Sequence, residues 1–172
     1  SIPNEAVVIE IFPKAKEEPP IQPASDGYVF RYQHTPDKKH WPRIRVRVRN
    51  TSRRRLYCSL LHMTSLFGID PSYLDEAGVW LEPEEEAYVA GNRAFRLSVK
   101  DEFYQTGRKE VVEIFKLIVS TNEFDANRFA QKALNAPKTR DIGRGIGGEG
   151  RSPIEDNDWN ATHLSLRIIR EN

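Results

Sequence analysis

The sequence has only one cysteine and lacks any hydrophobic run long enough to cross a membrane as a helix. Because Cys58 is alone, no disulfide can form within the chain, and we expect a reducing compartment, the cytoplasm. A membrane helix needs about 18 consecutive apolar residues, and no run in this sequence approaches that length. The opening SIPNEAVVIEIF also lacks the basic start and continuous apolar block of a signal peptide. Since the chain begins with Ser rather than Met, we expect it to be part of a longer protein.

Basic and acidic residues are segregated along the chain, although the net charge is only +1. Residues 31–55 contain ten Lys or Arg and one acid, Asp37, whereas residues 56–92 contain seven acids and no Lys or Arg. The two stretches could neutralise each other, or one of them could face a partner.

Short segments of strand-forming residues, separated by turns, dominate the chain. RIRVRVRN at 43–50 alternates strictly, which predicts a strand with Ile44, Val46 and Val48 inward and four arginines outward. Further strands are expected at 6–12, 27–33, 56–67, 94–99, 111–120 and 163–169. One short helix is expected at 125–134, with Asp125 as its N-cap.

This pattern predicts an all-β fold, an antiparallel β-sandwich with one short helix and a long Gly-rich loop. We expect an N-terminal strand and a Pro-rich linker in residues 1–26, followed by the sandwich domain in 27–172. Trp159, just before the last strand, is expected to be buried and to anchor that strand to the core.

The segment GRGIGGEG, residues 143–150, holds five of the ten glycines and matches G-x-G-x-x-G twice. A nucleotide loop of this type follows a buried strand and opens a helix, so that backbone N–H groups meet the phosphates. Neither flank here provides a strand or a helix, and the P-loop lysine followed by Ser or Thr is absent. We therefore interpret the segment as a loop and expect no cofactor.

No arrangement of residues in the sequence predicts catalysis. Cys58 and His62 share a strand face but lie about 13 Å apart along it, too far for a Cys–His pair. We expect Cys58 to be a small core residue. The four histidines are dispersed without metal-ligand spacing, so we expect no catalytic residue and no metal.

The candidate interaction face is basic, and it comprises Arg43, Arg45, Arg47, Arg49, Arg53, Arg54 and Arg55. It could bind nucleic acid, because aromatic residues lie nearby in the sequence. Alternatively, these arginines pair with acids such as those at 82–86, which is the interpretation we favour. Exposed ion pairs contribute only about 0–1 kcal/mol each, so replacing Arg45, Arg47 and Arg49 by Gln should barely change stability.

Several segments resemble a known family pattern. RIRVRVRNTSRRRLY has a strand ending in Asn-x-Ser, then basic residues, then Leu-Tyr; VWLEPEEE is similar to a Leu-x-Pro-Gly step, with Glu84 replacing the glycine. GRKEVVEIFKLIVSTNEFDANRF and DNDWNATHLSLRIIR resemble the last two strands of that pattern. Together they resemble the β-rich accessory domain found C-terminal to caspase-like peptidase domains in bacterial and fungal multidomain proteins. The resemblance covers residues 44–169.

The resemblance implies a non-catalytic role in regulation, substrate presentation or partner docking. The peptidase's His-Gly and Asp-x-Cys motifs do not occur here, so its catalytic half would lie outside this chain. The expected partner is another protein or the catalytic domain of the same polypeptide. The alternative is a nucleic-acid or polyanion-binding β-domain that uses the basic strand, and we expect no membrane contact.

Overall fold

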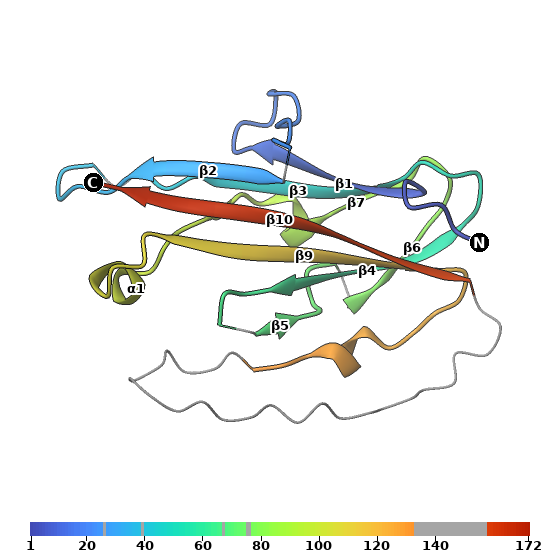
Figure 1. Cartoon of the computed structure of the whole chain (residues 1–172). Coiled ribbons are helices and arrows are strands. Elements are labelled where there is room, and N and C mark those ends of the chain that lie inside the picture. The colour runs from blue at the N-terminus through green and yellow to red at the C-terminus, as the bar shows by residue number, and fades with distance from the viewer. Residues whose placement is uncertain (26, 39, 67, 75–76, 133–157) are drawn as a thin grey trace.

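Two β-sheets packed face to face form the molecule (Figure 1), as expected for a β-sandwich. The computed structural model describes the chain except for residues 26, 39, 67, 75–76 and 133–157. In the first sheet the strands are β1 (Val7–Pro13), β3 (Arg43–Asn50), β7 (Glu86–Tyr88) and β8 (Phe95–Arg96). In the second they are β2 (Tyr28–Gln33), β10 (Trp159–Glu171), β9 (Glu110–Ser120), β4 (Leu56–Met63), β5 (Ile69–Asp70) and β6 (Val79–Leu81).

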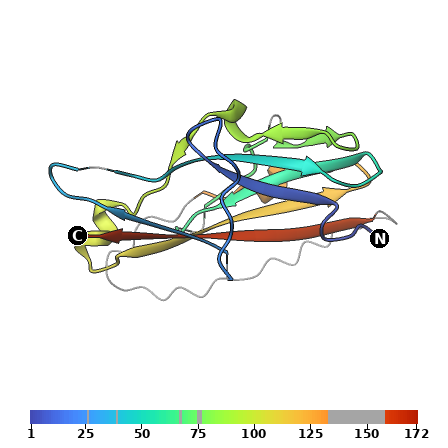
Figure 2. The ribbon, with the colours of Figure 1, turned by 90° about the horizontal axis from the view of Figure 1, so that it is seen from above.

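The core lies between the sheets and is built by alternation along the long strands. The three apolar residues of β3 face inward as predicted, and none is more than 1% exposed. They share one buried cluster with Phe115 and Leu117 of β9 and Leu166 and Ile168 of β10. Seen from above, the first sheet lies over the second (Figure 2).

Strand β10 lies between β9 and β2 in the second sheet. It pairs antiparallel with β9 from Trp159 to Ile169, and parallel with β2 from Leu166 to Glu171. The other strand pairs of the described residues are antiparallel. A parallel pair joins segments that are far apart in the sequence, and here β2 and β10 are the second and last strands.

Residues 1–26, which the sequence analysis separates from the domain 27–172, contribute β1 to the first sheet. Strand β1 pairs with β3 over its whole length, from Val7 opposite Asn50 to Pro13 opposite Ile44. The Pro-rich segment after β1 then folds back, and the Ile21 amide donates to the Ile11 carbonyl at 2.7 Å.

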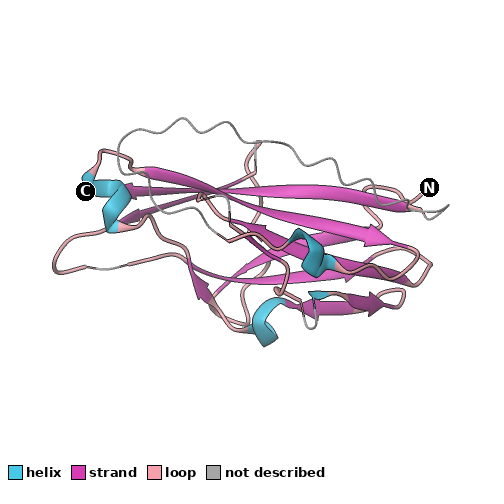
Figure 3. Ribbon diagram, turned by 90° about the horizontal axis from the view of Figure 1, so that it is seen from below, coloured by secondary structure: helices cyan, strands magenta, loops and turns pink. Residues whose placement is uncertain are grey.

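In the residues that the structure describes, helical structure is confined to short peripheral segments (Figure 3). Asp125 caps one of them as predicted, since its side chain accepts from the Asn127 amide at 3.0 Å. That segment is a 3-10 helix, Ala126–Phe129, and not the longer helix expected, because Ala130 already has extended backbone angles. The α-helix α1 (Asp101–Gln105) was not predicted; Arg170 of β10 holds it through an ion pair with Asp101 at 2.6 Å.

Trp159 is 55% exposed, so the expectation that its ring is buried was wrong. The reason is the period of two along β10: Leu164, Leu166 and Ile168 face the core, and Trp159 has the opposite parity. The Gly-rich segment 143–150 lies outside the described residues.

Candidate interaction surfaces

Strand β3 carries most of the predicted arginine face. Its neighbours in the sheet determine what each arginine meets, because directly opposed residues on one face of a sheet are in contact range. Arg47 lies opposite Glu10 of β1 and Tyr88 of β7, and Arg49 lies opposite Glu86 of β7. At the start of the strand, Arg43 lies opposite another arginine, Arg96 of β8.

Two carboxylates neutralise one end of the face. Glu10 accepts from Arg47 at 2.6 Å and from Arg49 at 3.2 Å, and Arg47 also pairs with Glu86 at 3.0 Å. Burial opposes the charge on Arg47, but its hydrogen bonds with Glu10, to which it donates, and with Tyr88, together with the charges of Glu10 and Glu86, outweigh burial and raise the pKa of Arg47. These side chains therefore form a compact ion network.

Arg45, in the middle of the strand, is almost fully buried, with 5% of its surface exposed. Its guanidinium donates to the carbonyls of Pro13 and Ala15, each at 3.0 Å, and to Oδ1 of Asn92 at 3.1 Å. The chain that follows β1 thus folds over Arg45 and is held by it. This side chain is not part of an accessible face.

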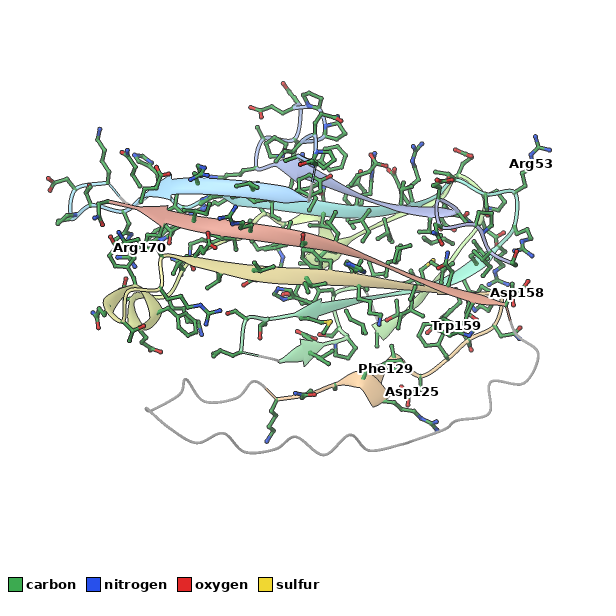
Figure 4. The ribbon with its side chains drawn as sticks, in the orientation of Figure 1. Arg53, Asp125, Phe129, Asp158, Trp159 and Arg170 are labelled. Atoms are coloured by element: carbon green, nitrogen blue, oxygen red, sulfur yellow. The ribbon has the colours of Figure 1, made fainter. Side chains whose placement is uncertain are left out.

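The turn arginines have three different environments. Arg55 pairs with Glu82 at 3.0 Å and lies 4.4 Å above the ring of Trp80. Arg54 makes a long contact of 3.5 Å with the carbonyl of Ser1. Arg53 projects away from the molecule (Figure 4), and no partner for it is recorded among the described residues.

The predicted arginine face is therefore not one accessible surface. Glu82 and Glu86 pair with arginines, in line with the favoured interpretation, but the most heavily used acid is Glu10, which the sequence analysis missed. The alternation in VVIEIF does place Glu10 on the outward side of its strand. What the sequence does not reveal is that this strand lies beside β3.

The outer side of the second sheet is different in character, and we call it the apolar side. Of the described residues, four large hydrophobic side chains are strongly exposed, at 43–55%: Val29, Val112, Phe129 and Trp159. Val29 and Val112 flank Arg167 in one row across β2, β10 and β9. Phe129 belongs to the segment that passes beneath this sheet, and Trp159 lies at the start of β10 (Figure 4).

A shallow hollow of about 540 Å³ lies on the apolar side. Its apolar lining includes Met63, Ile69, Val112 and Ile114, and its polar lining includes Arg108, Glu110 and Gln131. Apolar floors with a polar margin are typical of protein-binding surfaces.

Cys58 and His62 lie on the same face of β4, as predicted, and that face is turned to the core. Burial raises the pKa of the Cys58 thiol to about 12, so the thiol is protonated at neutral pH. His62 contacts Glu113 at 2.9 Å and packs on the ring of Phe115. Cys58 is thus a core residue in this structure.

In the described part of the chain, no group of three His, Cys, Asp or Glu side chains is placed to hold a metal ion. Each helix found there is too short and too polar to span a bilayer.

Comparison with protein-family models and with curated proteins finds no match to this chain.

Proposed function

We propose that the chain is a non-catalytic interaction module that binds a protein through the apolar side of its second sheet. One observation carries the proposal: all four strongly exposed large hydrophobic residues of the described chain lie on that side. Exposed apolar surface grouped on one face is a feature of protein-binding sites, whereas single scattered residues are not.

The first sheet supports the same choice by contrast. Four acid–arginine ion pairs on or beside it involve Arg47, Arg49 and Arg55, and Arg45 is buried. A polyanion would have to bind Arg43, Arg53 and Arg54. Arg43 is the first residue of β3, whereas Arg53 and Arg54 follow its end, so most of the strand separates them and they form no continuous basic stripe.

The resemblance to accessory domains of caspase-like peptidases suggests the partner, the peptidase domain of the same polypeptide. Two of the motifs that carry the resemblance interlock here. The Asn50 side chain donates to the carbonyls of Arg54 and Leu81, and the Glu84 amide donates to the Asn50 carbonyl at 2.9 Å. Glu84 has a φ of 65°, the conformation for which glycine is favoured. This conformation accounts for the glycine that the related pattern has at the position of Glu84.

The test begins with the full open reading frame, which should encode a His/Cys peptidase domain upstream. The two halves are then expressed separately, and their binding is measured by calorimetry. Val112→Glu should weaken binding about tenfold or more, because it places a charge within an apolar interface. The matched control is Val8→Glu, the same substitution on the outer face of the first sheet, where Val8 lies opposite Arg49.

Binding that both variants reduce equally, or a reading frame without a peptidase domain, would refute the proposal. We expect both variants to fold, because each substitution is at a side chain that is partly or strongly exposed.

A further inference from the structure

Arg43 and Arg96 lie directly opposite each other at one end of the first sheet. Like charges in directly opposed positions of an antiparallel pair destabilise the sheet. Both side chains are exposed, and the ion pairs recorded for the described residues involve neither of them. This repulsion is therefore left without a compensating carboxylate from the described chain.

Arg45 adds a third positive charge to the same place. It lies two residues from Arg43 on the same face of β3, about 7 Å along the strand. Among the described residues, its guanidinium is held only by neutral groups, two carbonyls and the Asn92 amide oxygen, and also lies 5.3 Å from the ring of Phe12. A buried charge that is balanced by dipoles alone leaves a positive potential at the nearby surface.

The aromatic neighbours orient one of these arginines. The Arg96 guanidinium lies 4.3 Å from the ring centre of Trp41, and His34 packs against Trp41 with 5.9 Å between ring centres. Nδ1 of His34 is buried and has no hydrogen-bond partner in the described structure. Because Arg96 and His34 both contact Trp41, its ring is not an open platform for stacking a nucleic-acid base.

From this geometry we propose that Arg43 and Arg96 form a binding site for a phosphate monoester. Such a group carries about 1.5–2 negative charges at pH 7 and three acceptor oxygens, which can accept from two directly opposed arginines. The ligand is recognised by the phosphoryl group itself, attached to a protein side chain or to a small molecule. This site is on the first sheet, so it does not depend on the protein-binding function proposed for the second.

The test is calorimetric titration of the chain, at low salt, with inorganic phosphate and with a phosphoserine peptide beside its unphosphorylated form. Arg43→Gln and Arg96→Gln should each weaken binding of both phosphate probes about tenfold, the effect of removing a charge-assisted hydrogen bond. Arg93→Gln is the matched control, because Arg93 is exposed, belongs to the same segment and, within the described part of the chain, its side chain donates only to the Ala90 carbonyl. The Arg93→Gln variant should bind both phosphate probes with the same affinity as the unchanged chain.

A peptide that binds more tightly than inorganic phosphate would assign the ligand to a phosphorylated protein, and the reverse order to a small phosphate ester. The proposal is overturned if neither probe binds, or if Arg93→Gln weakens binding as much as the other two variants. It is also overturned if a single-stranded oligonucleotide without a terminal phosphate binds more tightly than both probes.

Discussion

Identical residues in an alternating pattern have different environments in this protein. Arg43 is exposed, Arg45 is buried under the chain after β1, and Arg47 and Arg49 share Glu10. The sequence pattern assigns all four to one outward face, and it is correct about the direction in which they point. It contains no information about what covers that face, because the cover comes from another part of the chain.

The contrast between Arg45 and Arg43 gives the first prediction. Arg45→Gln should lower the free energy of unfolding by about 2–3 kcal/mol, because buried carbonyl groups lose a charged donor. Arg43→Gln, two residues away, should change it by less than about 0.5 kcal/mol. Urea denaturation of both variants measures the difference. The expectation that substituting Arg45, Arg47 and Arg49 leaves stability unchanged assumed exposed side chains, and Arg45 is 5% exposed.

Trp159 leads to a second prediction, since more than half of its surface is exposed. Trp159→Ala should cost about 1 kcal/mol or less, whereas Phe115→Ala, at a residue with 0% exposure, should cost about 3–5 kcal/mol. Thermal or urea unfolding of the two variants checks this ranking. Equal losses would show that the Trp159 ring is packed more closely than the structure indicates.

At the scale of elements, the long strands were predictable and the short ones were not. Strands β3, β9 and β10 have enough residues for alternation or a continuous apolar run to be recognised. Strands β5, β6 and β7 have two or three residues each, too few to show any period. These short strands form because their backbones pair with the edges of β3 and β4, which is a tertiary effect.

The turn that joins β6 and β7 is the place for a third prediction. Glu84 there has a φ of 65°, a conformation that costs an ordinary residue about 1 kcal/mol. Glu84→Gly should therefore raise the free energy of unfolding by about 0.5–1 kcal/mol, part of the gain being offset by the greater freedom of the unfolded chain. Ala87→Gly, within β7, should lower it, since that residue has ordinary strand geometry. Denaturation midpoints with unchanged slopes would verify both signs.

At the scale of the whole molecule, the thiol of the buried Cys58 and the phenol of the partly buried Tyr73 link stability to alkaline pH. Burial raises the pKa of Cys58 from 9.0 to about 12; burial and the charges of Asp70 and Glu113 raise that of Tyr73 from 10.0 to about 12. Between these values the unfolded chain has released the proton and the folded chain still holds it. The contribution of these two groups to stability is therefore fully present below about pH 9 and is lost as the pH rises toward 12.

Cys58→Ala tests this linkage. In the unchanged protein the thiol should contribute a decline of about 1.4 kcal/mol per pH unit between pH 9 and 12. The variant should lose that part and show a shallower decline, to which the raised pKa values of Tyr73 and Tyr28 still contribute. Urea unfolding at a series of pH values measures the slopes, and parallel curves for the two proteins would contradict the assignment.

The position of β10 between β2 and β9 has a consequence for how the protein is made. Residues 159–171 are synthesised last among these strands, yet they are the pairing partner of both β2 and β9. A ribosome-bound chain that lacks them presents β2 and β9 with unpaired edges, which are prone to aggregation. The second sheet can therefore be completed only after this segment has emerged from the ribosome.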